Sequence, residues 1–402
     1  MITTLTVAVG IVLAGAESEL SFDLKLDTVL KSWDGRYDWA QVWAGSIPGA
    51  GRDGNPLVVI TTQKEDNKSD DFYLGVNTIT SPDFGVTWTG PESHSELEPH
   101  QRPDGTIRGL CDFVSGWHAP TGKLLITGHT VDYAKGHLAP TGYSRSTAYA
   151  SFDPKTRAWT PWRELKLTDA EKFYNSGSGM CQWVAEPDGT ILLPVYYKSR
   201  SEDVGECYSV TILRCRFDGN ELSYLAHGDE LHHDVPRGLC EPSLTRFKGR
   251  FYLTLRNDER GYVTSSDDGQ RFAPKKPWQF DDGSELGSYN TMQHWVTHSE
   301  GLYLVYTRRG ANNDHVIRNR APLFMAQVDP ERLCVLRATE RILVPDRGAS
   351  LGNFGVGTIN EKETWVTVGE CMYSPECEKR GSDGSVFAAR IVWSKPNALA
   401  PR

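Results

Sequence analysis

A two-strand unit recurs six times along the 402-residue chain, and this repeat constrains the fold more than any other feature. Each copy opens on a polar residue in a short apolar run, passes through a turn, and closes a second apolar run on another polar or aromatic residue. The period is roughly 50 to 70 residues, which is typical of a four-stranded propeller blade. The sequence therefore predicts an all-β fold, a six-bladed β-propeller of four-stranded antiparallel sheets.

The two sets of polar residues are the first candidates for a site. The openers are Gln41, Asp112, Gln182, Glu241, Gln293 and Asn353, and the closers are Gln63, His129, Tyr196, Arg256, Arg308 and Glu370. In a blade the first strand starts and the second strand ends at the same face. We therefore expect the twelve side chains, with His294 beside Gln293, to form two rings at one mouth of a central pore.

A second repeat marks hairpin turns. Residues 81–88 and 265–272 both read Ser-x-Asp-x-Gly-x-x-aromatic, with Ser81, Asp83 and Gly85 in one copy and Ser265, Asp267 and Gly269 in the other. The Asp and Ser side chains can hydrogen-bond the turn backbone, and glycine accepts a left-handed conformation. Weaker copies place Asp153, Asp218 and Asp329 at equivalent turns. This motif, the Asp-box, predicts architecture and not a site.

The ends of the chain suggest how the ring closes and where the protein goes. We expect Glu19 to Asp27 to pair as a strand with Val386 to Trp393, which removes exposed sheet edges and makes residues 17–402 a single domain. Residues 1–16 are apolar and end in Ala14-Gly15-Ala16, which indicates a signal peptide and a secreted or periplasmic protein, the alternative being a cytoplasmic one. The run is too short to span a membrane.

Composition limits the possible partners. The net charge is -9 and no dense basic run is present, which argues against nucleic acid. Any acidic partner must be met by local positive charge. Of eight cysteines, Cys111, Cys181 and Cys240 recur at one blade position and are predicted to be buried thiols, whereas Cys371 and Cys377 flank a loop and can pair. The zinc-binding spacings of Cys and His are missing, so neither a metal nor a cofactor is expected.

Two arginines give the predicted mouth its chemistry. Arg256 and Arg308 end equivalent strands of adjacent blades, and their planar donor forks suit a carboxylate or a sulfate. The alternative interpretation is a structural network in which Glu241, Glu370 and Asp112 neutralise both arginines.

The Asp-boxes, the six-fold period and the strand 241–244 leading through 249–255 to Arg256 resemble the sialidase superfamily over nearly the whole chain. The resemblance implies that Glu241 supports a nucleophile, that Arg256 and Arg308 clamp a sugar carboxylate, and that Glu370 steadies another arginine. The chain departs from the family at three places. Asn353 and Phe354 stand where the nucleophilic Tyr is expected, Gln63 stands where the acid/base Asp is expected, and the Arg-Ile-Pro signature is missing, with Arg36 the only nearby substitute. Tyr306 and Tyr373 are the remaining candidates for the nucleophile.

Three hypotheses about function follow. The first is a sialidase-like glycoside hydrolase that cleaves an acidic sugar, with Glu241, His129, Tyr196 and Asp112 as catalytic candidates and with substrate bound by Arg256, Arg308, Gln41, Gln182, Gln293, His294 and Glu370. The second is a polysaccharide lyase that eliminates at a uronic acid through His129, Tyr196 and Arg256, similar in kind to ulvan lyases. The third is a non-catalytic propeller that binds an acidic glycan or polysaccharide.

Overall fold

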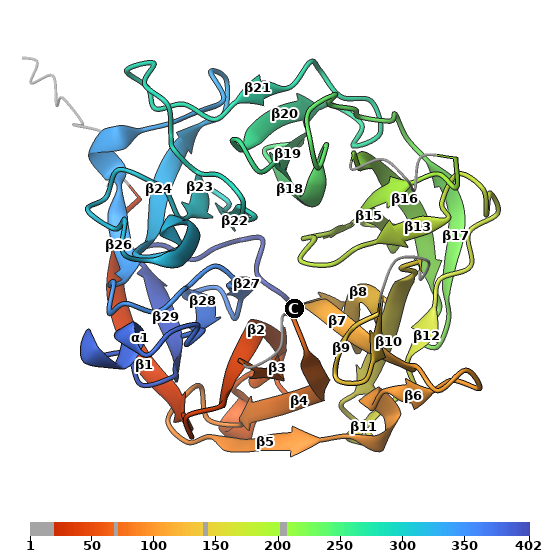
Figure 1. Ribbon diagram of the computed structural model, residues 1–402. Helices are drawn as coiled ribbons and strands as arrows, with labels where there is room; N and C mark the ends of the chain where they lie inside the picture. Colours follow the sequence, from red (N-terminus) through yellow and green to blue (C-terminus); the bar gives the residue numbers. More distant parts are fainter. Residues whose placement is uncertain (1–19, 68–70, 140–143, 202–206) are drawn as a thin grey trace, which may run out of the picture.

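Six antiparallel sheets surround a central axis in the computed structural model, which describes residues 20–67, 71–139, 144–201 and 207–402 (Figure 1). The sheets follow one another around the ring in chain order, and each runs from an inner first strand to an outer last strand. The predicted six-bladed β-propeller is therefore confirmed. The proposed signal peptide, residues 1–16, lies outside the described residues.

The strands of the first three blades have the following bounds. Blade one contains β2 (Tyr37–Ile47), β3 (Leu57–Asp66), β4 (Tyr73–Ser81) and β5 (Thr89–Ser93). Blade two contains β7 (Ile107–His118), β8 (Lys123–Ala134), β10 (Thr147–Asp153) and β11 (Ala158–Trp159), with β6 (His100–Gln101), β9 (His137–Leu138) and β12 (Arg163–Glu164) added. Blade three contains β13 (Asn175–Gly177), β14 (Val184–Ala185), β15 (Thr190–Lys198), β16 (Ser209–Phe217) and β17 (Leu222–His227).

The other three blades complete the ring. Blade four contains β18 (Cys240–Phe247), β19 (Arg250–Arg256), β20 (Tyr262–Ser266) and β21 (Lys276–Pro277). Blade five contains β22 (His294–His298), β23 (Gly301–Tyr306), β24 (Leu323–Asp329), β25 (Cys334–Val335) and β26 (Arg341–Val344). Blade six contains β27 (Gly355–Thr358), β28 (Glu363–Gly369), β29 (Ser385–Trp393) and β1 (Phe22–Lys31), and the short helix α1 (Glu376–Lys379) lies in its β28–β29 loop.

The first described strand closes the ring from the outside of the last blade. β1 pairs antiparallel with β29, with Phe22 opposite Trp393 and Lys31 opposite Ser385. The expected pairing of the two ends of the chain is thus confirmed, although the strand runs to Lys31 and not only to Asp27. Because this pairing joins segments more than 350 residues apart, it holds blade six to the start of the chain and covers the free edge of β29.

Aromatic side chains fill the spaces between blades. Trp43, Trp278, Trp295 and Trp365 are among the largest fully buried side chains. Trp43 and Trp295 lie on the inner strands β2 and β22, Trp365 lies on β28, and Trp278 follows β21 of blade four and packs on Trp295 of blade five. Burying a large apolar side chain stabilises a fold by roughly 1.5–3 kcal/mol. These contacts therefore fix how the blades sit against one another, and so position the side chains at the mouth.

The two Asp-boxes form the predicted hairpin turns, but the second one is shifted by one residue. Asp83 accepts a hydrogen bond from the Thr87 amide, and the Gly85 amide donates to Ser81 Oγ. In the other copy, the side chains that bond the turn backbone are those of Ser266 and Asp268, and not those of Ser265 and Asp267. The second turn is one residue shorter. Ser81 Oγ bonds the amide four residues further along the chain, whereas Ser266 Oγ bonds the amide three residues further along. The weaker copies are also confirmed, since Asp153, Asp218 and Asp329 each accept backbone N–H groups of their own turns.

All eight cysteines are free thiols. The possible Cys371–Cys377 disulfide is not formed: the Cys377 thiol donates to the Gly348 carbonyl at 3.4 Å, and the Cys371 backbone pairs with Ser350. Cys111, Cys181 and Cys240 are buried, as predicted. The described part of the chain contains no helix that is long and apolar enough to cross a lipid bilayer.

Candidate active site at the mouth of the propeller

A left-handed bulge places the polar opener at the mouth in three blades. Gln41, Asp112 and Glu241 all have positive φ, at 55°, 61° and 42°. In each blade the pairing register with the second strand shifts at this point. A non-glycine residue in this region costs on the order of 1 kcal/mol, and such strain is concentrated at functional sites. The recurrence of the bulge shows that the fold repeatedly turns this residue out of the strand.

Asp112 and His129 form a hydrogen-bonded pair on blade two. His129 Nε2 lies 3.0 Å from Asp112 Oδ2, while Nδ1 contacts the Thr130 carbonyl at 2.9 Å. The ring rests against Gly177 and Gly179, where an added Cβ would come within 2.8 and 2.3 Å of the imidazole. The Asp112 side chain keeps 18% of its surface exposed, whereas that of His129 keeps 3%. The carboxylate is therefore the accessible end of a proton-holding pair.

Tyr196 continues this group onto blade three. Its ring meets the His129 ring edge-on, with centroids 6.3 Å apart. Arg145 lies over both Tyr196 and Tyr208, and donates to the Tyr208 hydroxyl at 3.1 Å. Burial raises the pKa of the Tyr196 hydroxyl well above its usual value, so this phenol keeps its proton. Three of the predicted catalytic candidates, Asp112, His129 and Tyr196, are thus brought together.

Glu241 and Arg256 form a buried ion pair on blade four. Arg256 Nη1 lies 2.6 Å from both carboxylate oxygens, and the two side chains are 8% and 5% exposed. Burial disfavours the charged carboxylate, but Arg256 outweighs this effect and lowers the pKa of Glu241 to about 2. Both groups therefore stay charged across the physiological range, and the pair matches the part of the alternative interpretation in which Glu241 neutralises Arg256.

The second arginine of the mouth is Arg320, which sequence reasoning missed. Arg256 Nη2 donates to the Asn290 side-chain oxygen at 2.8 Å, and Arg320 Nη2 donates to the main-chain carbonyl of the same residue. Burial and the charge of Arg256 lower the pKa of Arg320 to about 10, so it remains a cation that faces another cation. Gly352 makes room for it, because a Cβ there would come within 2.3 Å of its side chain.

A third arginine lies beside the Glu241–Arg256 pair. Arg237 lies 3.8 Å from Asp258, which is also 3.5 Å from Arg256. Each of the three arginines retains a buried Nε–H without a partner. Three guanidinium groups therefore surround the two carboxylates of Glu241 and Asp258.

A group of acids and a phenol lies beside Arg320, between blades six and one. Tyr373, in the loop after β28, has its hydroxyl 3.4 Å from Glu65 Oε1, and 37% of the residue is exposed. Glu65 and Asp38, at the ends of β3 and β2, are both 1% exposed. Their facing oxygens and Cys371 Sγ lie within 4.8 Å of one another. Tyr373 and Cys371 also line a cavity of about 400 Å³ that reaches Arg318.

Ionising Asp38 and Glu65 at the same time is energetically unfavourable, because both carboxyl groups are buried and their charges repel each other. Asp38 Oδ2 accepts hydrogen bonds from Asn67 and the Met372 amide, but Oδ1 and Glu65 Oε2 have no hydrogen-bond partner. Burial raises the pKa of Asp38 to about 6. Burial, and then the charge of Asp38, raise the pKa of Glu65 well above its usual value. Near neutral pH the pair therefore keeps one proton and one negative charge.

This pair gives a testable dependence of stability on pH. Because the folded pKa of Asp38 is raised, its proton stabilises the fold fully below the unfolded pKa, and that contribution is lost as pH rises through about 6. At roughly 1.4 kcal/mol per pKa unit, the loss is about 3 kcal/mol. We expect Asp38→Asn to gain about this much stability relative to the wild type between pH 4 and pH 8 in urea denaturation. A difference that does not change with pH would contradict the paired acids.

Arg308 does not join Arg256. It forms a bidentate pair with Glu340, at 3.0 and 2.8 Å, and its guanidinium stacks over Phe324 of β24, so it belongs to the outer part of blade five. Tyr306 donates to the same Glu340 and is fully buried, which removes it as a nucleophile. The predicted convergence of Arg256 and Arg308 is therefore wrong. Arg308 follows the end of β23, and its side chain points along the sheet toward Glu340 and not toward the axis.

The remaining predicted residues hold blades together. Gln41 accepts from the Asp112 amide, and Gln293 is 1% exposed and bonded to Ser288, Thr291 and Thr254. His294 is fully buried between Trp43 and Phe354, and burial lowers its pKa to about 3.

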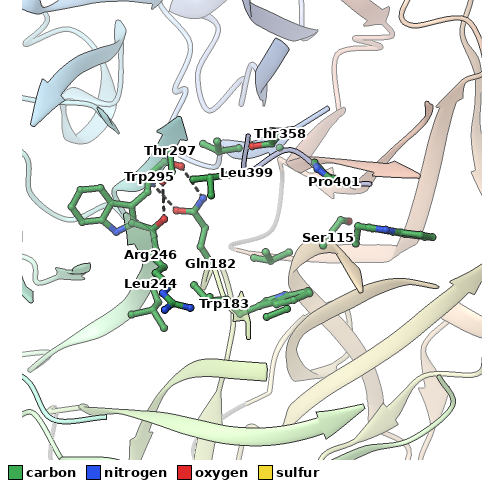
Figure 2. Close-up of a pocket in the computed structure, with 18 of the residues that line it drawn as sticks. Ser115, Gln182, Trp183, Leu244, Arg246, Trp295, Thr297, Thr358, Leu399 and Pro401 are labelled. Atoms are coloured by element: carbon green, nitrogen blue, oxygen red, sulfur yellow. Dashed lines mark hydrogen bonds between the residues drawn. The ribbon is translucent and has the colours of Figure 1, made fainter. Parts of the chain in front are cut away.

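Glu370 accepts from the Asp383 and Ser385 amides and lies 3.3 Å from Arg347. Gln182 lines a cavity at the opposite end of the axis. Its side-chain amide donates to the backbone carbonyl of Trp295 and accepts from the backbone amide of the same residue (Figure 2).

The fold and the arginine-bearing mouth together define a sialidase-like β-propeller. Comparison with solved structures agrees: an unknown-function protein from Dyadobacter fermentans superposes with a TM-score of 0.63 at 15% identity, over 91% of this chain and 99% of that one. A Trypanosoma rangeli sialidase gives 0.58 at 14% identity over 93% of this chain and 60% of its own. The Hadza microbial sialidase Hz136 gives 0.60 at 12% identity, over 88% and 66%.

These likenesses establish the fold. This chain spans about 60% of the length of the trypanosomal sialidase, which has also been solved in complex with sialic acid. Protein-family models give no match to the sequence, and neither do curated proteins.

Proposed function

We propose that this protein is a glycoside hydrolase that acts on an acidic sugar, with Tyr373 as nucleophile and Glu65 as its base. The observation that carries the proposal is the position of Arg320. This arginine shares Asn290 with Arg256 and lies within electrostatic reach of both Glu241 and Tyr373. A cationic anion-binding group and a partly exposed phenol with a carboxylate beside it thus face one mouth.

The chemistry assigned to each group follows from its surroundings. Glu65 Oε1 takes the phenolic proton as Tyr373 attacks the anomeric carbon, and a covalent glycosyl-enzyme forms. Asp38 supports this step because Glu65, whose pKa burial and the Asp38 charge raise, passes its own proton to the Asp38 carboxylate and is then free to accept the phenolic proton. The His129–Asp112 pair supplies the proton that the departing oxygen needs. Water then releases the sugar by the reverse transfers, so no group is consumed.

The arginines supply the selectivity for an anion. Burial keeps Arg256 and Arg320 in a medium of low dielectric, where a charge-assisted hydrogen bond to a carboxylate is strong. The overall charge of -9 repels acidic glycans, so arginines at the mouth are needed for binding.

A substrate screen tests the proposal. Sialosides and uronic-acid glycans are incubated with the purified protein, and products are followed by reducing ends and by ultraviolet absorbance. Hydrolysis releases a reducing end without a new double bond. Turnover of neutral glycans alone would contradict the assignment of the arginines.

One observation favours a second candidate, β-elimination at a uronic acid. His129, Tyr196 and Arg145 gather on blades two and three, and they provide a base or acid, a phenol that keeps its proton and a cation. A lyase leaves an unsaturated product that absorbs in the ultraviolet, so the same screen separates the two reactions.

A further inference from the structure

A cavity lies at the opposite end of the axis from Glu241 and Arg256. It has a volume of about 630 Å³, and its wall takes residues from β2, β7, β14, β18, β22 and β27, so all six blades contribute (Figure 2). Asp112 and Trp117 lie on the same strand, β7, and five residues of strand span roughly 16 Å. The cavity is therefore separate from the proposed active site and independent of it.

Tryptophans dominate the wall of this cavity. Trp43, Trp117, Trp183 and Trp295 line it. The Trp183 ring lies against Gly116 of β7, where an added Cβ would come within 2.3 Å of the ring, so the glycine allows the indole to lie close to the strand. An indole face is an apolar platform, and its N–H is a donor. A pyranose ring can stack on such an indole face and form hydrogen bonds at the edge of the stacked ring.

Two of these indoles have unused donors. Nε1 of Trp43 and Nε1 of Trp183 are buried and have no hydrogen-bond partner, and Trp43 as a whole is 1% exposed. An unpaired buried donor costs roughly 1–3 kcal/mol. Because both N–H groups are enclosed by protein, they do not reach a ligand in the cavity, and its polar contacts come from Arg246, Lys248 and the hydroxyl groups of the wall.

The charge of the wall selects among ligands. The residues that line the cavity include Arg246 and Lys248 but neither Asp nor Glu, although the chain carries 52 acidic residues. Arg246 has one ion pair, at 3.3 Å, with Glu186, and it remains 40% exposed. Hydroxyl groups of Ser, such as Ser299, and of Thr supply further polar contacts around the rim. The combination fits an acidic saccharide better than a neutral one.

We propose that this cavity is a second, non-catalytic binding site for an acidic saccharide, with a sugar ring stacked on Trp183 and its carboxylate or sulfate at Arg246 and Lys248. A propeller with sites at both ends of its axis holds a long acidic chain on one face while the other face carries out its own chemistry. The ligand is bound without any covalent step.

Isothermal titration calorimetry with a uronic-acid hexasaccharide tests this site, with a neutral cello-oligosaccharide as the comparison. We expect Trp183→Ala and the double variant Arg246→Gln/Lys248→Gln each to weaken binding of the acidic probe at this site by tenfold or more. The double variant changes exposed side chains, so it remains informative if the tryptophan variant fails to fold. Tyr373→Phe, at the other mouth, serves as the control and keeps this binding.

The number of sites separates this inference from the proposed function. If both are right, the wild type binds two acidic saccharides and the Arg246→Gln/Lys248→Gln variant binds one. If only the active-site assignment fails, the wild type binds one and the variant none. Equal binding of the neutral probe, or unchanged acidic binding in both variants, would overturn the second site.

Discussion

Replacing Tyr373 by Phe is expected to reduce turnover of an acidic glycoside on the order of 10³-fold or more while leaving binding nearly intact. The reason is that the variant loses one oxygen, the atom that attacks the sugar, and keeps the ring that packs in the loop after β28. Glu65 would lose only a contact of 3.4 Å. The measurement is kcat and KM for the substrate found in the screen, with circular dichroism as a check of folding.

Tyr196→Phe is the matched control for this experiment. Both changes remove a phenolic oxygen from the same mouth, but Tyr196 is 3% exposed and lies beside His129 and Arg145. In a hydrolase that uses Tyr373, the Tyr196 variant keeps turnover within about tenfold. The opposite result, in which Tyr196→Phe is inactive and Tyr373→Phe is active, would transfer the chemistry to the lyase candidate.

The parts of the site that sequence reasoning located are those set by the repeat. Asp112 and Glu241 open equivalent strands, and His129, Tyr196 and Arg256 close their partners, so a single alignment of the blades places them at one level. Their convergence follows from the symmetry of the fold and needs no knowledge of side-chain direction.

The parts that sequence reasoning missed lie outside the repeat or depend on side-chain direction. Arg320 stands at the end of the irregular segment between β23 and β24, and only the three-dimensional path of that segment returns it to Asn290. Arg308 occupies the expected position in the alignment of the blades, but its side chain forms an ion pair with Glu340 and does not join Arg256. Asp38 and Glu65 lie at the mouth-side ends of β2 and β3, where Tyr373 arrives from blade six, and a contact between the first and last blades has no local signal.

The pairing of Glu241 with Arg256 makes a further prediction with a large effect. Changing Arg256 to Met removes the cation but keeps the length of the side chain, and it leaves the buried Glu241 carboxylate without its hydrogen-bonded partner. Such a change costs about 3–5 kcal/mol of folding free energy. The pKa of Glu241, now about 2, would rise because burial would no longer be opposed by Arg256. We expect the loss of stability in chemical denaturation to be larger at pH 8 than at pH 4, where the buried Glu241 can be protonated.

The double variant Glu241→Met/Arg256→Met separates the structural role of this pair from its functional role. Removing both charges eliminates the uncompensated carboxylate, so most of the lost folding free energy should return. Binding of an acidic glycan should nevertheless stay weakened by tenfold or more, because Arg320 and Arg237 then face the ligand without the fork of Arg256. A double variant that is both stable and fully active would show that the pair only holds blade four together, and the anion site would then have to be assigned to Arg320 and its neighbours alone.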